Sequence, residues 1–379
     1  MKFVLMPDSF KGTMSSSEIC DEMQSVIHQY YPESEIIKIP VADGGEGSVD
    51  CFLEAVGGEK VNLTVQGPYG EPVEAFYGLL DHGKTAIIEM AAAAGLPLVG
   101  ENAHAEQTTT YGVGQLMLAA AKKGCTKMIV GLGGSSTNDL GVGAAAAAGI
   151  DFYNEAGEKF VPVGKNLSEI KRIDKSGLAP EFNQIEIITM CDIDNPLYGE
   201  SGAAHIFGPQ KGADPAMVLL LDEQLKIASE TIKKELGLDV SMIPGAGAAG
   251  GMGAGMVAFF GSRLQMGIET VLDTVRFDSI LDENTLVFSG EGKIDSQSLR
   301  GKVVIGIARR TKLKNVPLVA VVGDIGDSIE NAYSEGVSAI FSINRVAVDF
   351  KVAKTRSRSD LQLTMDNLMR FLKRMNVLK

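Results

Sequence analysis

Five short apolar runs in this chain are each followed almost at once by a polar, turn-forming segment. The runs are residues 3–6, 35–40, 127–130, 185–190 and 285–289, and the polar segments are residues 8–12, 43–47, 131–141, 191–195 and 290–295. Longer amphipathic stretches separate these pairs, which is typical of mostly parallel strands alternating with helices in an α/β protein. Ligands bind at the carboxyl ends of strands in open α/β sheets, so the polar segments are candidate site loops.

The first strand and helix can be read directly from the residues. Residues 3–6 predict a strand, and the hydroxyls of residues 15–17, followed by Glu18, predict a helix start. Apolar side chains then recur at helical spacing, at Ile19, Met23, Val26 and Ile27. Residues 35–40 predict the second strand and residues 49–56 the helix after it.

A change of pattern between residues 60 and 80 indicates a second domain. Residues 61–65 and 73–77 flank Gly67-Pro68-Tyr69-Gly70, which predicts a hairpin. Buried strands separated by helical segments return at residues 285–289, 317–322 and 339–343. The length of 379 residues also favours two domains. We therefore predict a discontinuous, doubly wound parallel-sheet domain at residues 1–60 and 270–379, with a second α/β domain inserted at residues 61–269.

Composition excludes several classes of function. The formal net charge of −13 argues against nucleic-acid binding, and the basic stretch at residues 351–358 is read as a solvated face. No apolar run approaches the ~18 residues of a membrane span, and the first eight residues lack the features of a secretory leader. The four cysteines form no C-x-x-C pair and the four histidines no H-x-x-x-H pair. A cytoplasmic protein without a histidine-based metal site is therefore expected.

Residues 131–141, GLGGSSTNDLG, are the most distinctive of the polar segments. Glycines let backbone amides approach an anion closely, and the start of a helix behind them adds a favourable dipole. This segment therefore suits phosphate oxygens, although a capped strand-to-helix turn would have a similar sequence. The candidate phosphate-binding groups are the amides of Gly133 and Gly134 and the hydroxyls of Ser135, Ser136 and Thr137.

Carboxylates and lysines on the other polar segments strengthen this interpretation. Mg²⁺ bound to a phosphate prefers one or two carboxylates, and the candidates are Asp43, Glu46, Asp192, Glu291 and Asp295. Four lysines lie beside or one residue from a glycine: Lys11, Lys211, Lys293 and Lys302. Each residue alone would more often be a cap or an exposed turn residue. Neither Gly-Lys pair fits the P-loop pattern, so a kinase activity would use another phosphate cradle.

Other catalytic patterns have less support. Residues 245–250, GAGAAG, satisfy G-x-G-x-x-G, and Glu269 lies near the distance expected of a ribose-binding acid. Pro244 and the lack of a clear strand ending at Glu269 instead favour close helix packing or the wall of a binding cleft. No serine lies in a G-x-S-x-G elbow, so hydrolase chemistry is disfavoured. Phosphoryl transfer needs positioning, cations, Mg²⁺ and one base, and the sequence offers all of these.

Eight motifs, in order, closely resemble the glycerate kinase family of the bacterial glycerate 2-kinase type. They are PDSFKG (7–12), PVADGGEGS (40–48), TTTYGVG (108–114), GLGGSSTND (131–139), CDIDNPLYG (191–199), FGPQKGA (207–213), PGAGAAGG (244–251) and SGEGKIDSQSLRGK (289–302). The resemblance runs from residue 4 to about residue 343. It implies ATP- and Mg²⁺-dependent phosphorylation of D-glycerate to 2-phosphoglycerate, in glycerate, glycolate and sugar-acid catabolism.

The resemblance also implies two α/β domains, one of them flavodoxin-like and split by the other, with the active site in the cleft between them. Four residues depart from the usual pattern of the family: Ser48, Ser136, Leu140 and Val322. Leu140 stands where Gly is usual, and we expect it to add bulk beside the phosphate loop.

We assign the following expected roles. The amides of Gly133 and Gly134 and the hydroxyls of Ser135, Ser136 and Thr137 hold nucleotide phosphates, with Asn138 or Asp139 fixing the loop. Asp192 is the first candidate for the base, and Lys11 and Lys293 stabilise transferred charge or hold the glycerate carboxylate. Base and metal roles could be exchanged among Asp192, Asp43 and Glu46. Of these, we expect Asp43 to take part in catalysis, and Glu46 to bind the metal together with Glu291 and Asp295.

Several alternatives stay open at this point. The acceptor could be another small hydroxy acid or the 3-position of glycerate, and the chain could be a metabolite-binding sensor without catalysis. A dinucleotide oxidoreductase is disfavoured by the G-x-G-x-x-G context. A homodimer is possible, and no nucleic-acid or membrane partner is expected.

Overall fold

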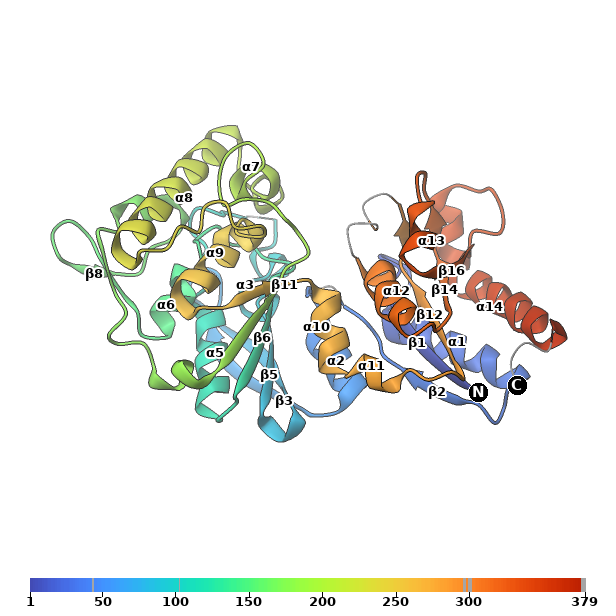
Figure 1. The fold of residues 1–379 in the computed structure, drawn as a ribbon. Coiled ribbons are helices and arrows are strands. Elements are labelled where there is room, and N and C mark those ends of the chain that lie inside the picture. The colour runs from blue at the N-terminus through green and yellow to red at the C-terminus, as the bar shows by residue number, and fades with distance from the viewer. Residues whose placement is uncertain (43, 102, 296–297, 299–301, 376–379) are drawn as a thin grey trace. The chain divides into compact units, whose positions relative to one another are not determined.

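The computed structural model describes residues 1–42, 44–101, 103–295, 298 and 302–375. The chain divides into two compact units, Met1–Asp43 with Ile268–Lys379 (unit 1) and Gly44–Gly267 (unit 2) (Figure 1). Unit 2 thus lies, in sequence, between the two segments of unit 1. The α/β class predicted from the sequence is confirmed, and in the described residues no helix is both long and apolar enough to cross a membrane.

Unit 1 is built on a five-stranded, wholly parallel sheet in the order β16-β14-β12-β1-β2. In chain order this is 2-1-3-4-5 from the β2 edge, the order of flavodoxin-type doubly wound sheets. Two residues each from β13 and β15 form a small parallel pair. The strands are β1 (Lys2–Pro7), β2 (Glu35–Lys38), β12 (Thr285–Gly290), β13 (Lys293–Ile294), β14 (Leu318–Val322), β15 (Asp324–Ile325) and β16 (Val337–Ser342).

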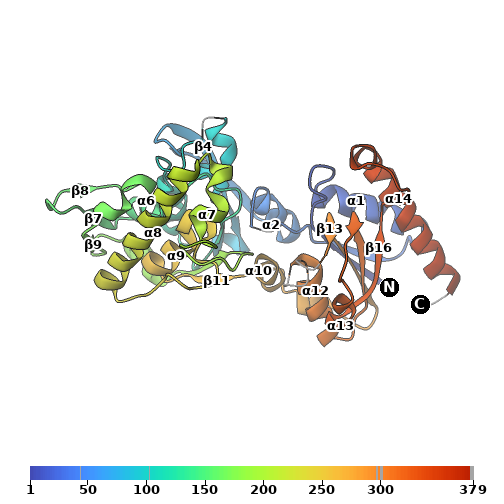
Figure 2. The ribbon, with the colours of Figure 1, turned by 90° about the horizontal axis from the view of Figure 1, so that it is seen from above.

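Helices cover both faces of the unit 1 sheet, with α1 and α14 on one side and α12 and α13 on the other (Figure 2). Ser15 caps α1 in a capping box with Glu18, as the sequence predicts. Apolar residues of α1 and α14 bury Phe3 and Phe288 of the sheet. The helices of unit 1 are α1 (Ser16–Tyr30), α10 (Gly267–Thr274, whose first residue belongs to unit 2), α11 (Phe277–Ile280), α12 (Val303–Leu313), α13 (Asn331–Glu335) and α14 (Phe350–Met375).

Unit 2 contains a six-stranded mixed sheet in the order β11-β10-β6-β5-β4-β3 and a small antiparallel sheet, β8-β7-β9. β3 and β4 form the predicted hairpin, and β5, β6, β10 and β11 are parallel to one another. The strands are β3 (Glu59–Gln66), β4 (Pro72–Leu80), β5 (Thr85–Glu89), β6 (Lys127–Gly131), β7 (Asp151–Tyr153), β8 (Lys159–Phe160), β9 (Arg172–Asp174), β10 (Glu186–Met190) and β11 (Arg263–Gln265).

Helices also cover the large sheet of unit 2. α5 and α9 share a core with β5 and β6, while α2 packs near Gly78 of β4 and so belongs to unit 2. We had expected the segment of α2, within residues 1–60, in the other domain. The helices are α2 (Ser48–Val56), α3 (Ala91–Ala94), α4 (Leu96–Val99), α5 (Tyr111–Lys122), α6 (Val142–Ala147), α7 (Ala203–Phe207), α8 (Pro215–Leu236) and α9 (Ala248–Phe260), with short 3₁₀ helices η1 (Asp81–Gly83), η2 (Gly164–Glu169), η3 (Pro180–Gln184) and η4 (Pro209–Lys211).

Leu140 has a left-handed backbone conformation, with φ of 58°, which costs free energy for residues other than glycine. We expected this residue to add bulk beside the 131–141 loop. Its side chain is instead fully buried in a hydrophobic cluster that includes Val142 and Leu225. The burial of the leucine side chain offsets the backbone strain, and the loop is not crowded by it.

This arrangement predicts an unusual order of stability. Both Leu140→Ala and Leu140→Gly should lose about 2–5 kcal/mol of unfolding free energy by opening a cavity. The glycine variant should be the more stable of the two by about 1 kcal/mol, because glycine alone adopts this φ without strain. Denaturant unfolding of both variants measures the difference.

Leu225 gives the matched control, because it is equally buried but lies within α8. There the order should reverse, with Leu225→Gly less stable than Leu225→Ala by about 1 kcal/mol. If the alanine variant is the more stable one at both positions, the backbone at Leu140 carries no strain.

Candidate active site

The loop that follows β6 is held against the segment that begins at Gly44. Gly133 donates its N–H to the Gly44 carbonyl at 2.9 Å. A Cβ on Gly131 would lie 2.4 Å from the Gly44 oxygen, and one on Gly133 would lie 2.4 Å from the Gly45 Cα. Glycine is therefore required at both positions for contact between the two backbones. The Gly133 N–H is therefore engaged within the fold and is not the free phosphate donor that the sequence predicts.

Glu46 is brought beside this loop by the same packing. Its Oε1 would lie 3.5 Å from a Cβ at Gly134. A buried carboxylate that the sequence analysis missed, Glu89 at the end of β5, accepts from the N–H groups of Gly47 at 3.2 Å and Val49 at 2.5 Å. These contacts satisfy the start of α2, and burial raises the pKa of the Glu89 carboxyl. Its place at the carboxyl end of a strand was the available signal.

The three hydroxyls of the loop have different environments. The Ser136 hydroxyl donates to the Ala94 carbonyl at 2.9 Å. Contrary to the prediction, it is engaged within the fold and does not offer its hydrogen to a phosphate. Ser135 is almost buried, and its oxygen accepts a hydrogen bond from Lys211. The N–H groups of Gly134 and Ser135 have no acceptor in the described part of the chain. Gly134 and Ser135 are therefore the open donors of the loop.

Asp139 fixes the end of the loop. This fully buried carboxylate accepts from the N–H and the hydroxyl of Thr110, both at 2.8 Å, and from the N–H groups of Gly141 at 3.1 Å and Gly143 at 3.3 Å. Burial raises the pKa of Asp139, and the four donors act in the opposite direction by favouring the ionised form. Asp139, and not Asn138, is thus the residue that ties the loop to α5 and α6.

Lys211 lies behind the loop at the end of η4. Its side chain is 1% exposed, and its Nζ donates to the Ser135 hydroxyl oxygen at 2.8 Å and to the Thr137 carbonyl at 2.7 Å. Burial lowers the pKa of Lys211 to about 7, partly opposed by the attraction of Asp139. The sequence marks this lysine only by the glycine beside it.

Thr137 and Asn138 carry buried polar groups without partners. The Thr137 hydroxyl and both the Nδ2 and Oδ1 atoms of Asn138 make no hydrogen bond to any described residue, although both residues are 0% exposed. Such groups cost about 1–3 kcal/mol each when they stay unpaired. A bound polar molecule or water that supplied partners would remove this cost.

Residues 245–250, the G-x-G-x-x-G match, pack against this loop. Ala249, Gly250 and Gly251 have left-handed backbone conformations at the start of α9. A Cβ on Gly250 would lie 2.1 Å from the Thr137 carbonyl oxygen, and Leu140 donates its N–H to the Gly250 carbonyl. The segment is a closely packed wall of the loop, as the sequence context favoured over a dinucleotide site.

Asp192 follows β10 and is half-buried. Its Oδ1 accepts from the N–H of Gly267, the first residue of α10, at 2.6 Å. This bond holds one carboxylate oxygen at the start of a helix, where negative charge is favoured. The residue therefore has a structural contact in addition to the catalytic role expected of it.

Unit 1 gathers carboxylates where β1 and β12 end side by side, since Asp8 donates its N–H to the Gly290 carbonyl at 2.8 Å. Glu291 is buried here and accepts from the Ser298 hydroxyl at 3.0 Å, while its Oε1 has no partner among the described residues. Burial raises the pKa of Glu291 to about 7; the Ser298 bond and Lys302 oppose the rise, and the charges of Asp8 and Asp295 add to it. Asp8 was not among the expected site residues.

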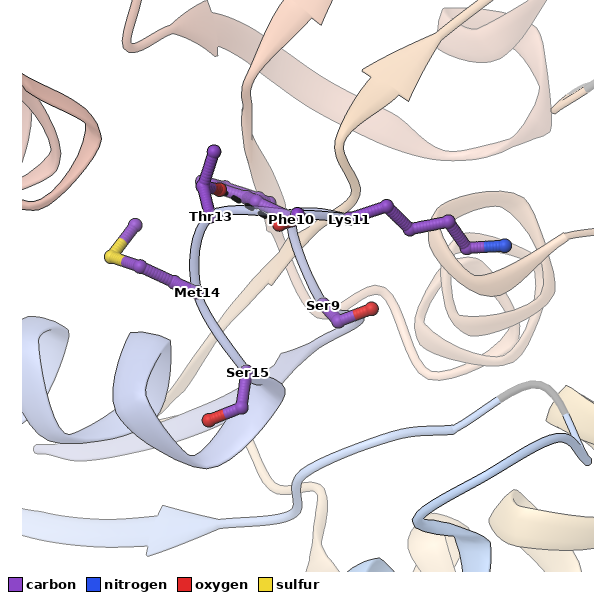
Figure 3. A pocket seen from close by; sticks show the side chains of 7 residues that line it. Ser9, Phe10, Lys11, Thr13, Met14 and Ser15 are labelled. Carbon is purple, nitrogen blue, oxygen red and sulfur yellow. Dashed lines mark hydrogen bonds between the residues drawn. The ribbon is translucent and has the colours of Figure 1, made fainter. Parts of the chain in front are cut away.

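The two expected catalytic lysines, Lys11 and Lys293, also lie in unit 1. Residues 9–15 line an open pocket of about 380 Å³, and Lys11 extends from this turn away from Met14 and Ser15 (Figure 3). The turn is closed by the Thr13 hydroxyl, which donates to the Phe10 carbonyl at 2.7 Å. Lys293 is exposed and starts the short strand β13. Asp43 lies outside the described residues.

The described residues form no group of three or more His, Cys, Asp or Glu side chains that could hold a metal ion unaided. Mg²⁺ bound to a nucleotide takes most of its ligands from phosphate oxygens and water, with one or two carboxylates. Glu291 fits such a cation, because positive charge would stabilise the ionised forms of its buried carboxylate and of the acidic groups near it.

A model of the glycerate kinase family matches residues 3–373. The chain belongs to the glycerate kinase family. It is 43% identical to the glycerate 2-kinase of Escherichia coli over 344 residues, 90% of each chain, and 41% identical to a glycerate kinase of Bacillus cereus over 369 residues, 97% of each. A solved structure titled as a glycerate kinase 2 from Salmonella typhimurium LT2 matches with a TM-score of 0.88 at 38% identity, covering 99% of each chain.

The raised pKa of Glu291 predicts how one substitution changes stability with pH. The folded state keeps the Glu291 proton up to pH about 7, above the ordinary value of 4.5, so stability falls as pH rises through this window. Glu291→Gln removes the ionisation and can still accept from Ser298. The variant should match the original protein near pH 4.5 and be more stable by about 3 kcal/mol at pH 8.

Denaturant unfolding in metal-free buffer at the two pH values measures this difference. Glu283→Gln is the matched control, because Glu283 is exposed. It should change stability little at either pH. A Glu291→Gln variant that gains no stability at pH 8 would show that the folded protein does not hold this proton.

Proposed function

We propose that this member of the glycerate kinase family transfers the γ-phosphoryl group of ATP to D-glycerate and forms 2-phosphoglycerate and ADP. Its place would be the catabolism of glycerate, glycolate and sugar acids. The observation that carries the proposal is the loop after β6, where the N–H groups of Gly134 and Ser135 have no acceptor among the described residues and a buried lysine contacts Ser135. Open amides next to a cation suit phosphate oxygens. The name of the relative from Escherichia coli, glycerate 2-kinase, supports the 2-position.

The nucleotide phosphates would bind on this loop. Gly134 and Ser135 would donate their N–H groups, and Ser135 its hydroxyl. Thr137 and Asn138 would supply the buried polar atoms that now lack partners. Asp139 would act only by keeping the loop in place, through four accepted hydrogen bonds.

Mg²⁺ would be held by carboxylates together with phosphate oxygens. Glu46, beside Gly134, and the acidic pair Glu291 and Asp295 are the candidates. When bound, the ion would offset the negative charge of the phosphate groups. Because a nearby cation favours the ionised carboxylate, it would also lower the pKa of Glu291.

Asp192 is our candidate for the base that accepts the proton of the glycerate hydroxyl. Its bond from Gly267 uses one oxygen and fixes the orientation of the carboxylate. Lys11 and Lys293 would offset the charge of the transferred group or of the glycerate carboxylate. Asp43 stays a further candidate for catalysis.

The proposal is tested by measuring ADP release from MgATP with D-glycerate, with enolase present to consume 2-phosphoglycerate. Phosphoenolpyruvate formed without a mutase supports the proposed substrate and position. If phosphoenolpyruvate forms only after a phosphoglycerate mutase is added, the phosphoryl group is transferred to the 3-position of glycerate. Absence of ADP release would exclude glycerate as the acceptor and favour another hydroxy acid or a sensor.

Asp192→Asn should lower the turnover number about 10²–10⁴-fold, the usual contribution of a general base. The amide oxygen of asparagine can still accept from Gly267, so the thermal midpoint should change little. Asp222→Asn is a control: Asp222 also accepts a backbone N–H, that of Gly199, at 2.8 Å. Turnover retained by Asp192→Asn would remove this residue from the chemistry.

Lys11→Ala should raise the KM for glycerate or lower the turnover number, because a cation near developing or bound negative charge would be lost. The lysine is exposed, so folding should be unaffected. Lys314→Ala, at an exposed position after α12, is the control. If both kinetic constants of Lys11→Ala equal those of the original protein, Lys11 is only a turn residue.

A further inference from the structure

The backbone around Lys211 fixes this buried lysine behind the loop. Lys211 ends η4, and the next residue, Gly212, has a φ of 86°. A Cβ on Gly212 would lie 2.1 Å from the Ala103 carbonyl oxygen, so the chain packs closely against Ala103 and only glycine fits at this position. The side chain of Lys211 therefore enters the protein interior from a closely packed turn and reaches Ser135 and Thr137 of the loop.

When Lys211 is protonated, its contact leaves the hydroxyl hydrogen of Ser135 available to a ligand. An ammonium group only donates, so the Ser135 oxygen accepts from Nζ at 2.8 Å. The hydroxyl hydrogen of Ser135 has no acceptor among the described residues, and the same holds for the N–H groups of Gly134 and Ser135. These three donors belong to two adjacent residues of the loop, of which Gly134 is exposed and Ser135 is 7% exposed, and Lys211 contacts Ser135.

The charge of Lys211 is only partly balanced within the protein. Asp139 attracts it, but that carboxylate makes its own hydrogen bonds to the backbone and to Thr110. The titratable side chains on neighbouring segments face other partners: His205 of α7 faces Asp222, and His104 faces Glu106. A bound anion would therefore be an important additional source of negative charge near Lys211.

We propose that Lys211 is a positioning residue that makes this loop an anion site, and that a phosphate-bearing ligand bound there is accompanied by proton uptake on Lys211. The inference rests on the proposed function, because it takes the nucleotide phosphates as the ligand of this loop. Burial holds the pKa of Lys211 near 7, so above pH 7 the lysine is mostly neutral before the ligand binds. The negative charge of the ligand then favours the ammonium form.

The linkage has a definite sign. Between the pKa of Lys211 in the ligand-free protein and its higher value in the complex, binding takes up a proton, so affinity falls as pH rises. The limiting slope is about tenfold for each pH unit, since one proton is involved. The measurement belongs between pH 7.5 and 9, where phosphate groups with a second pKa of about 6 are already ionised.

Calorimetric titration of the full-length protein with MgATP and with ADP tests the proposal. Two buffers with different ionisation enthalpies give the number of protons taken up. The original protein should take up a fraction of a proton near pH 8, and the Kd should increase toward pH 9. Lys211→Met, which keeps the length and the apolar stem, should weaken binding about 10–100-fold and abolish this proton uptake.

Lys211→Arg separates the charge from the titration. The guanidinium stays protonated throughout this pH range, so binding should be stronger than in Lys211→Met while proton uptake is lost. Lys175→Met is the matched control, because burial also lowers the pKa of Lys175 but its Nζ donates to the Ala258 carbonyl at 3.3 Å instead of to the loop. This control should bind with the original affinity and proton uptake. Circular dichroism checks that each variant is folded.

The outcomes distinguish this inference from the proposed function. Original affinity and proton uptake in folded Lys211→Met would overturn the inference, even if the protein phosphorylates glycerate. Nucleotide binding with proton uptake but without transfer to glycerate would overturn the proposed function and leave the inference standing. If Lys211→Met does not fold, proton uptake that persists in Lys211→Arg would overturn the inference. Failure of the original protein to bind MgATP or ADP would also overturn it.

Discussion

Asp139 is the group on which the candidate site depends. Its buried carboxylate accepts four hydrogen bonds, two from Thr110 before α5 and two from the N–H groups of Gly141 and Gly143 around the start of α6. A buried carboxylate is tolerated when its bonds are made, and each donor lost would leave a charge less well satisfied. The same four bonds set the path of the chain after β6. Along this path Thr137 and Asn138 are fully buried, Ser135 is 7% exposed, and Gly134 is exposed.

Close contact between backbones completes the site in unit 2. Gly131 and Gly133 allow the segment at Gly44 to lie directly on the loop, and Glu89 binds the N–H groups that follow this segment. Glu46 is thus placed next to Gly134 by contacts of its neighbours and not by its own side chain. The candidate metal ligand therefore depends on residues from three separate parts of the sequence.

The sequence predicted the elements of this fold better than it predicted the roles of single groups. Short apolar runs predicted the strands, and apolar residues at helical spacing predicted helices such as α1. Ser15 with Glu18 identified the start of α1. All of these signals are local in the sequence. Which loop hydroxyl is free to bind a phosphate depends on distant residues. Ser136 donates to the Ala94 carbonyl, 42 residues away, and Ser135 accepts from Lys211, 76 residues away. Spacing along the chain carries no information on such partners. For the same reason Glu89 and the burial of Lys211 were missed.

The unsatisfied groups of the protein concentrate where the sequence placed the site. In the described residues six buried side-chain atoms lack a hydrogen-bond partner, and four of them belong to Thr137, Asn138 and Glu291. Each such group costs about 1–3 kcal/mol of stability for as long as it stays unpaired. Ligands that offer oxygen acceptors and positive charge would recover this free energy on binding. The stability lost at Thr137, Asn138 and Glu291 would then be a source of affinity, as expected of polar groups that a fold leaves unpaired at a binding site.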